Sequence, residues 1–498
     1  MKVMERHIVR HVFVVCVLTM TWACASRTSP PAVSVPEPAT QAPESPPAPA
    51  PNPEPPPPAL PAPVPRQEVV APQCGVISEA GAPIATVALN DRVNAANAPR
   101  PTNDSERLLF RQIYETLVRV DCEGRVVPSL ASSWRLSIDG HTWIVALREG
   151  ARFSDGTPVT AREVRASWSR DGTGGELQPH VNRLVRSLIS IDDQTLAITL
   201  RSQRVDVPLA LAHTDLAIAK PVPGSLWPAG TRGAQITGNR ETLVVTTADD
   251  VPSVRFLAGP GDPRDFLDKG VDLLVTRDAA ALNYAATLGQ FQSVPLAWQR
   301  TYVLLTSGRT RASSTVSEEA RQALAVDAVR GDARGAMGPF WWQMAPDCEI
   351  SFPQPRDQSA PASGRIVYEA TDSAARDLAE RFVGLANSSG AGASAAFETL
   401  FPDRARRANH RAAGLAGEAL ALARRRGTDA GYVVAIDTRS LEPCHDVQLM
   451  IEGAPWVDPE TVVPLVETRL HAIVRRGRSG VDAAWDGGLL ITGLNGSR

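Results

Sequence analysis

A short polar segment late in the chain carries residue types that can pair with a charged solute. It follows a predicted strand at Tyr432–Ile436 and contains Asp437, Arg439, Glu442, His445 and Asp446. A carboxylate here can pair with an ammonium group, and a guanidinium can hold a carboxylate through two hydrogen bonds. These residue types suit a zwitterion such as a peptide or an amino acid. The alternative is an ordinary surface loop whose Cys444 forms a disulfide.

The same segment offers a metal-binding alternative, through His445 together with Glu442 or Asp446. Transition-metal sites usually gather several nitrogen or sulfur ligands, so one histidine beside carboxylates is a weak signal. The sequence therefore predicts no metal site and no cofactor. His180, in a polar loop after a glycine-containing turn, is a second candidate for a ligand-binding cleft.

Hydrolytic chemistry has little support in the sequence. The chain contains no H-E-x-x-H, G-x-S-x-G or S-x-x-K motif and no phosphate-binding glycine loop. A dispersed Ser-His-Asp triad stays open as an alternative, because its members need not be adjacent in sequence. Only eight histidines are present, and two lie in the first eleven residues. An exported hydrolase is therefore a less favoured alternative.

The first 24 residues have the pattern of an export signal. Basic residues precede an apolar run, Val12–Met20, that is too short to be a permanent membrane span. The run is followed by Thr21-Trp22-Ala23-Cys24, in which a small residue precedes a cysteine, as in bacterial lipoprotein signals. We expect lipidation of Cys24 and a place in the periplasm or cell envelope, with contact to the membrane through the lipid only. Cleavage without lipidation is the alternative.

Four cysteines remain after the signal: Cys74, Cys122, Cys348 and Cys444. In an oxidising compartment four thiols predict up to two disulfides, with three possible connectivities. Zinc binding is disfavoured because no C-x-x-C pair exists.

Residues 25–67 are predicted to form a disordered linker rich in proline. This composition cannot bury a core and favours extended polyproline II, at about 3.1 Å per residue. We interpret it as a stiff tether, with a ligand for a proline-recognition domain as the alternative. The formal net charge of −3 gives no reason to expect a nucleic-acid partner.

The folded body begins near residue 68 and first alternates strands with tight turns. We expect strands at Thr86–Leu89, Trp134–Ile138, Thr142–Arg148, Leu188–Ile191 and Thr195–Leu200, and a helix capped by Asp104 or Ser105. Asp139-Gly140 between two alternating runs predicts a hairpin. Thr160 and Glu163 form a capping box that opens another helix. Trp134, Trp143 and Trp168 are expected in the core.

The second half alternates short apolar strands with helices. Strands are expected at Val254–Leu257, Leu273–Thr276, Tyr302–Thr306, Ile366–Glu369 and Tyr432–Ile436, and helices at Ser317–Val329 and Ala412–Arg426. This alternation favours an α/β protein with largely parallel sheets.

Four stretches together resemble a known family signature. They are Ile113-Tyr-Glu-Thr-Leu117, Gly124 through Trp134, Asp139 through Arg148, and Phe153-Ser-Asp-Gly-Thr-Pro-Val-Thr-Ala-Arg-Glu-Val164. Their order and spacing resemble solute-binding protein family 5, the binding proteins of oligopeptide, dipeptide and nickel importers. The similarity continues more weakly through Val254–Val275 and Glu319–Val326.

The resemblance implies a two-lobed periplasmic-binding-protein fold, type II or cluster C-like, with hinge strands crossing between the lobes. We place the crossings near Asp272–Arg277 and Tyr432–Asp437. Lobe I would hold residues 68–277 together with 438–498, and lobe II residues 278–437.

For function, the resemblance implies a monomer that captures a small ligand, a peptide above all, and delivers it to ABC permease subunits. It also places the segment after Tyr432–Ile436, and Ser307 after another strand, at the ligand. Ser307 stands where the family commonly has Asn. A member that senses a ligand or binds the cell envelope without transport is the alternative.

Overall fold

The computed structural model describes residue 76 and residues 81–201, 208–247, 253–305, 324, 333–336, 365–387, 411–416, 419–427, 430–456 and 462–494. These residues belong to one unit, Val69–Arg498. The predicted signal peptide, the Pro-rich linker, Ser307 and the predicted helix Ser317–Val329, except for residue 324, lie outside them, as do Cys24, Cys74 and Cys348. No helix among the described residues is long and apolar enough to span a membrane.

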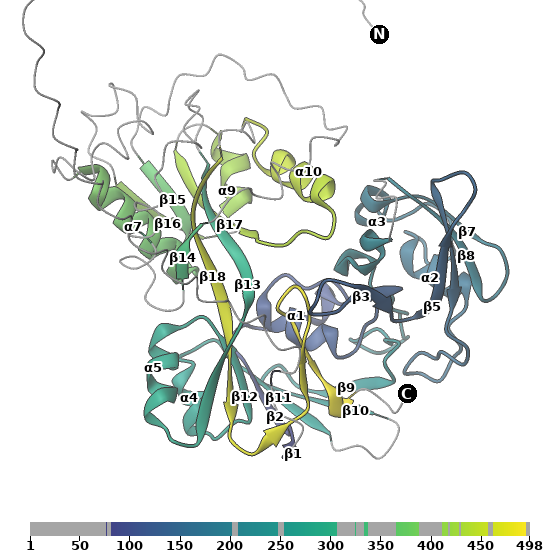
Figure 1. The fold of residues 1–498 in the computed structure, drawn as a ribbon, viewed down its shortest axis with the longest axis horizontal. Coiled ribbons are helices and arrows are strands. Elements are labelled where there is room, and N and C mark those ends of the chain that lie inside the picture. Colours follow the sequence, from purple (N-terminus) through teal and green to yellow (C-terminus); the bar gives the residue numbers. More distant parts are fainter. Residues whose placement is uncertain are drawn as a thin grey trace, which may run out of the picture. The chain divides into compact units, whose positions relative to one another are not determined.

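The largest sheet of the described residues has eleven strands (Figure 1). In spatial order they are β16 (Arg411–Leu415), β15 (Arg365–Glu369), β17 (Gly431–Asp437), β13 (Phe291–Leu305), β18 (Val463–Arg475), β12 (Leu273–Thr276), β2 (Thr86–Leu89), β11 (Val254–Ala258), β10 (Thr242–Thr247) and β9 (Ala234–Gly238). The eleventh strand, β14 (Ala333–Gly335), pairs with β18.

The long strands β13 and β18 run through both halves of this sheet (Figure 1). From β13, Leu296 enters the core around α1 (Asp104–Arg111), while Tyr302 enters the core around α7 (Ser373–Asn387). Strand β18 divides in the same way, with Val474 in the first core and Leu465 in the second. Two separately packed halves therefore share one antiparallel strand pair.

Their pairing is irregular in its middle. The register shifts between Pro295 and Trp298 and again before Arg300. Beside this irregularity the Trp298 ring lies against two guanidinium groups, those of Arg334 at 4.4 Å and Arg469 at 4.5 Å from the ring centroid. Such cation–π contacts stabilise a stretch where ladder hydrogen bonds are missing.

Each half packs helices on its part of the sheet. Helices α4 (Arg264–Asp268) and α5 (Ala279–Thr287) cover one end, with Phe266 and Ala281 in a common core. At the other end α7 lies on one face, while α9 (Ala419–Arg426) and α10 (Pro443–Gly453) lie on the opposite face.

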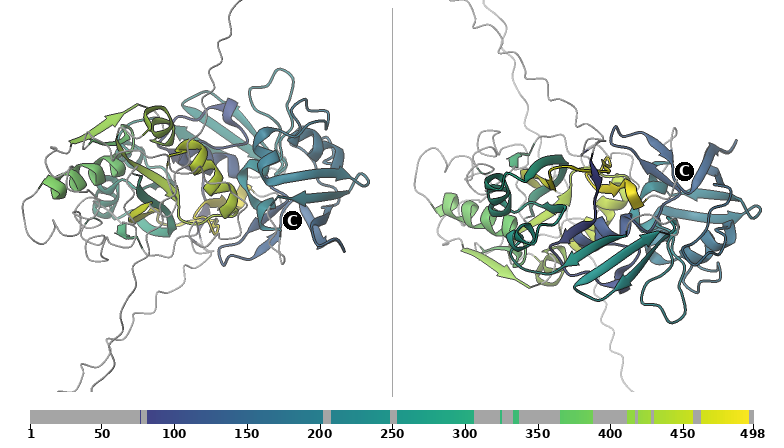
Figure 2. Two further views of the ribbon diagram at one scale, coloured as in Figure 1. Left: turned by 90° about the horizontal axis from the view of Figure 1, so that it is seen from above. Right: turned by 90° about the horizontal axis from the view of Figure 1, so that it is seen from below.

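A block formed by residues 117–229 has its own core and an antiparallel four-stranded sheet. The sheet order is β5 (Ala131–Leu136), β6 (Thr142–Leu147), β8 (Thr195–Leu200) and β7 (Val185–Ser190), packed with α2 (Ala161–Trp168) and α3 (Pro179–Leu184). In both views of Figure 2 this blue block and the green segment with α7 lie on opposite sides.

Shorter elements complete the described chain. They are β1 (Ala82–Pro83), β3 (Val118–Val120), β4 (Val126–Pro128), β19 (Arg478–Ser479), β20 (Val481–Ala483), β21 (Leu489–Ile491) and the 3-10 turns η1 (Ala95–Asn97), η2 (Leu209–Ala212), η3 (Thr214–Leu216) and η8 (Thr492–Leu494). The pair β20–β21 is a C-terminal hairpin.

Several local predictions are confirmed. The Asp139-Gly140 hairpin joins β5 to β6, and the Thr160 hydroxyl accepts a hydrogen bond from the Glu163 amide at 3.3 Å. Trp143 and Trp168 are buried, and Trp134 packs partly buried on the same core.

Other predictions are wrong. The residues predicted as a helix from Ala412 instead begin with β16, which pairs in parallel with β15, and only the later part is helical, as α9. Gly414 allows this pairing, because a Cβ there would lie 2.9 Å from the buried Tyr368 ring. The main sheet is mixed, since β13 and β18 pair antiparallel. Asn103 caps α1, not Asp104 or Ser105.

Gly230, directly after the block, provides a test of how the chain packs against the segment that follows α1. A Cβ at Gly230 would lie 2.2 Å from the Ile113 carbonyl oxygen, which also accepts a hydrogen bond from the Arg232 amide. We expect Gly230→Ala to lower the free energy of unfolding by about 1–3 kcal/mol through overpacking. Urea unfolding followed by circular dichroism measures this.

Gly384→Ala is the matched control, because nothing lies within 4 Å of its Cβ position on α7 and alanine favours helix by about 1 kcal/mol. Equal midpoints for Gly230→Ala and the unmodified chain would contradict the packing described.

Candidate functional site

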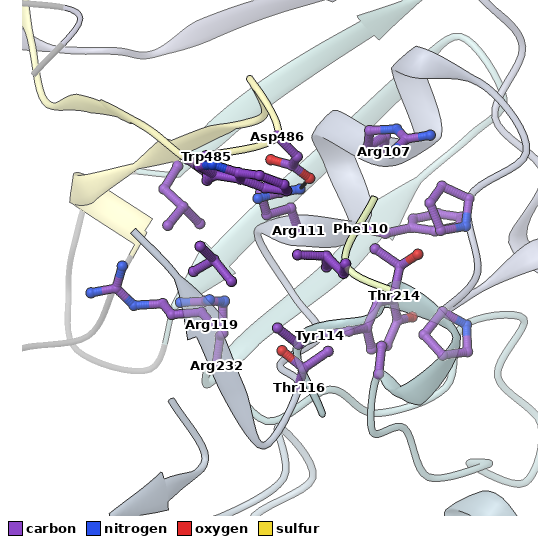
Figure 3. Close-up of a pocket in the computed structure, with 18 of the residues that line it drawn as sticks. Arg107, Phe110, Arg111, Tyr114, Thr116, Arg119, Thr214, Arg232, Trp485 and Asp486 are labelled. Atoms are coloured by element: carbon purple, nitrogen blue, oxygen red, sulfur yellow. Dashed lines mark hydrogen bonds and ion pairs between the residues drawn. The ribbon is translucent and has the colours of Figure 1, made fainter. Parts of the chain in front are cut away.

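An open pocket lies where α1, the start of β3, η2–η3 and the C-terminal hairpin meet (Figure 3). Its empty volume is about 1110 Å³, which includes space that is open to solvent. Its charged and aromatic lining includes Arg107, Arg111, Arg119, Arg232, Trp485 and Asp486.

Helix α1 positions two of these arginines. The Asn103 side chain accepts a hydrogen bond from the Glu106 amide at 2.8 Å and fixes the first turn. Arg107, Phe110 and Arg111 then follow at spacings of three and four residues, which places them along one side of the helix, toward the pocket. Leu108 and Leu109 are buried in the core.

The pocket lining has more positive than negative charge. Four arginines line it, against the carboxylates of Asp482 and Asp486. Arg111 is bonded to Asp486, as Figure 3 shows, and Arg107 lies 3.8 Å from the Asp437 carboxylate. Burial, together with the like charges of Arg111 and Arg119, lowers the pKa of Arg232 despite the opposing effect of Glu115. An anionic group in the pocket would relieve this repulsion.

Ion pairs of Asp104 connect α1 to the end of β12 and to β13. The Asp104 carboxylate is bonded to Arg277, just after β12, and lies 3.4 Å from Arg300 on β13. Arg277 also donates a hydrogen bond to the Gln299 side chain at 3.0 Å. Burial raises the Asp104 pKa, but the guanidinium groups outweigh that effect and hold the pKa far below its usual value. The carboxylate therefore stays ionised.

The predicted segment, residues 437–446, lies beside the pocket, and its charged residues Asp437 and Arg439 contact residues that line the pocket. Leu441 lines the pocket, whereas Asp437 contacts the lining residue Arg107. Arg439 donates a hydrogen bond to the Trp485 carbonyl at 2.6 Å, and its guanidinium lies 5.1 Å from the Trp485 ring centroid. Both charged groups thus support the wall of the pocket.

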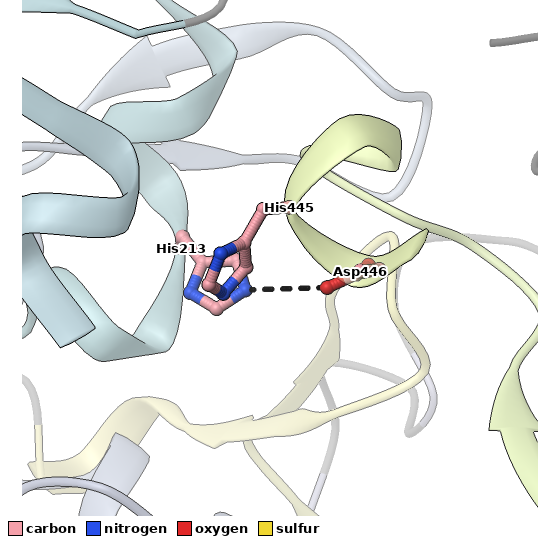
Figure 4. Close-up of side chains that lie close together, drawn as sticks. All are labelled: His213, His445 and Asp446. Atoms are coloured by element: carbon pink, nitrogen blue, oxygen red, sulfur yellow. Dashed lines mark ion pairs between the residues drawn. The ribbon is translucent and has the colours of Figure 1, made fainter. Parts of the chain in front are cut away.

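The other predicted residues lie near one another at the start of α10. Glu442 and His445 are buried, and Asp446 accepts a hydrogen bond from the Ser440 hydroxyl. His445 and Asp446 face His213, which lies between η2 and η3 (Figure 4).

His180 lies apart from this segment and contacts Arg100 at 2.8 Å. Burial and the Arg100 charge lower its pKa to about 4. Cys122 and Cys444 are each disulfide-bonded.

Sequence reasoning missed the arginines of α1, Arg232 and the Trp485–Asp486 turn. Arginines three or four residues apart on a predicted helix look like a solvated face, so the pattern carries no sign of a pocket. The Asp486-Gly487 turn that follows Trp485 could have predicted the C-terminal hairpin of β20 and β21.

The chain matches a known family over residues 125–246, the bacterial extracellular solute-binding proteins, family 5 Middle. Over this region the chain is similar to solute-binding protein family 5. Among curated family 5 proteins it is 32% identical over 119 residues to the periplasmic oligopeptide-binding protein OppA of Salmonella typhimurium, covering 24% of this chain and 22% of that protein. It is 31% identical over 126 residues to the glutathione-binding protein GsiB of Escherichia coli K12, covering 25% of each. The chain thus matches about a quarter of the length of these relatives.

Solved family 5 structures share the fold over most of the chain. The dipeptide-binding protein of Pseudoalteromonas in complex with Met-Leu has a TM-score of 0.57 at 12% identity, covering 82% of this chain and 99% of that one. The DppA protein of Helicobacter pylori with the peptide STSA has a TM-score of 0.55 at 14% identity, covering 84% and 98%. The two-lobed periplasmic-binding-protein fold is confirmed, while the lobe boundaries stay a prediction.

The Asp104 network predicts a pH dependence of stability. The Asp104 pKa is lower in the folded chain than its ordinary 3.8, so its stabilisation is present above that value and is lost as pH falls toward the folded pKa. We expect Asp104→Asn to lower the free energy of unfolding by about 1–3 kcal/mol at pH 7 and to flatten its decline below about pH 4.

Denaturant titrations from pH 7 to pH 2 measure this difference. Asp193→Asn is the control, because its pair with Arg162 is exposed and contributes little. If the free energy of unfolding declines in parallel with falling pH for Asp104→Asn and the unmodified chain, Asp104 does not cause the pH dependence.

Proposed function

We propose that this protein is an extracytoplasmic solute-binding protein that captures a short anionic peptide in the pocket at α1. The observation that carries the proposal is the excess of guanidinium groups lining a pocket beside the shared strands of a family 5 fold. Guanidinium groups bind carboxylates through paired, charge-assisted hydrogen bonds. The aromatic rings of Phe110, Tyr114 and Trp485 provide apolar surface for a side chain or backbone.

The composition of the pocket supports a ligand with both charged and apolar parts. Relatives are named for oligopeptide binding and for glutathione binding, and glutathione is itself an acidic peptide. Asp486 and Asp437 offer carboxylates next to the arginines, so an ammonium group has a partner as well. A zwitterion with surplus negative charge matches both features.

Ligand capture would act on the shared strands β13 and β18. A ligand that contacts both sides of the pocket stabilises the closed arrangement by its difference in affinity for the closed and open states. The pocket is lined by residues of α1 and also by Leu441, which follows β17. Strand β17 pairs with the part of β13 that comes after the register shifts near Trp298. Binding therefore favours compaction about that irregularity.

Delivery to an ABC importer is the second part of the proposal. Family 5 proteins include an oligopeptide-binding protein described as periplasmic, which supports a place outside the cytoplasm. We propose ABC permease subunits as the partner, a monomeric receptor, and attachment to the membrane through a lipid on Cys24. The Pro-rich residues 25–67 would serve as the tether.

Thermal-shift screening of short peptides tests the binding step. We expect acidic peptides such as glutathione to raise the melting temperature, and the same peptides with amidated carboxyl groups to raise it less. Arg232→Met should weaken binding about tenfold or more, since a hydrogen bond to a charged group contributes about 1.5–3 kcal/mol.

Arg186→Met is the matched control, because Arg186 is exposed on β7 outside the pocket. Stabilisation that is the same for amidated and free peptides would overturn the anionic preference. An absence of stabilisation by every peptide would overturn the proposal itself.

A further inference from the structure

Two histidines and a carboxylate meet between segments that are far apart in the sequence. His213 joins η2 to η3, while His445 and Asp446 begin α10 (Figure 4). One potential ligand atom from each of the three lies within 4.8 Å of the others. The two rings are 5.1 Å apart between centroids and nearly perpendicular, at 87°. This spacing is within reach of a common ion after small side-chain adjustments.

His445 is the strongest sign of a ligand at this place. It is 3% exposed, and neither of its ring nitrogens has a hydrogen-bond partner. The Asp215 carboxylate lies 3.6 Å from its Nε2, and His445 helps to lower the pKa of Asp215 against the effect of burial. A buried polar group without a hydrogen bond costs about 1–3 kcal/mol, so such groups usually have an unseen partner or a function.

We propose that His213, His445 and Asp446 bind a divalent transition-metal ion. Two imidazole nitrogens and one carboxylate oxygen are a ligand set that suits Zn²⁺, Ni²⁺ or Fe²⁺, and three protein ligands leave at least one position open. Hard cations such as Mg²⁺ or Ca²⁺ prefer all-oxygen sites and fit this set poorly. In the sequence His445 stands alone beside carboxylates, because His213 is far away along the chain, so the pattern predicts no metal site.

The surroundings of His213 allow metal binding at Nε2. At present its Nδ1 accepts a hydrogen bond from the Asp215 amide at 3.1 Å, and its Nε2 points toward Asp446 at 4.0 Å. Metal binding through Nε2 requires the remaining proton on Nδ1, so the ring must change tautomer and the Asp215 amide must give up its hydrogen bond to Nδ1. The Asp215 carboxylate oxygen lies 3.9 Å from Nδ1 and can accept that proton's hydrogen bond after a small rotation. A carboxylate behind a metal-bound histidine is a common supporting arrangement.

The proposed ion would join the block of residues 117–229 to α10. A direct ion pair already connects them nearby, between Arg183 on the block and Glu452 on α10 at 2.8 Å. Ala212, Thr214 and Leu441, which flank the ligands in sequence, line the pocket. The open metal position would thus lie near the solute site. Metal binding itself does not require the proposed peptide function.

Isothermal titration of Zn²⁺ and Ni²⁺ into the full chain tests the inference. The protein carries no polyhistidine tag and is freed of metal with a chelator that is then removed. We expect one ion per chain, and weaker binding by about tenfold or more in His213→Ala, His445→Gln and Asp446→Asn. Asp215→Asn should weaken binding by about 10- to 100-fold through the supporting contact.

His141→Ala is the matched control, since His141 is exposed on the β5–β6 turn. Unchanged affinity in His445→Gln, with a folded circular dichroism spectrum, would overturn the site. The Co²⁺ spectrum of the unmodified chain needs no variant, and a spectrum identical to that of aqueous Co²⁺ would also overturn it. Peptide screening in the presence of chelator keeps this test separate from that of the proposed function.

Discussion

The pairing of β13 with β18 is the constraint on which the rest of the structure depends. Each strand supplies side chains to two separate cores, so neither half can complete its sheet without the other. The register shifts near Trp298 interrupt the regular ladder of hydrogen bonds between β13 and β18 at the point where the two halves join. A pair of continuous strands with an irregular middle holds two bodies together while allowing them to bend, as in hinged proteins generally.

Charge links this hinge to the pocket. Asp104 at the start of α1 is held by arginines after β12 and on β13, and the same helix presents Arg107 and Arg111 to the pocket. In the proposed function, a change in hinge geometry would therefore move the helix that lines the pocket. The low Asp104 pKa keeps this connection ionised across the neutral range.

The sequence predicted local elements well where turn chemistry was explicit. The Asp139-Gly140 hairpin and the Thr160 cap depend on neighbouring residues, and both formed as expected. Gly414 was misassigned because small residues at helical spacing fit a helix, whereas contact with Tyr368 selects the strand. The site was less predictable: Asp437 and Arg439 contact lining residues of the pocket without lining it themselves, and Arg232 and His213 become neighbours of this region only through tertiary contacts.

The central claim is that the chain encloses a small solute at the arginine-lined pocket. Native mass spectrometry of the protein purified from its own cell envelope tests this most directly. The account predicts a bound species of small, defined mass that is released on denaturation and lost when Arg111 and Arg232 are both replaced by methionine. Equal occupancy in that double variant, or a protein mass without any adduct together with no uptake from a peptide extract, would contradict it.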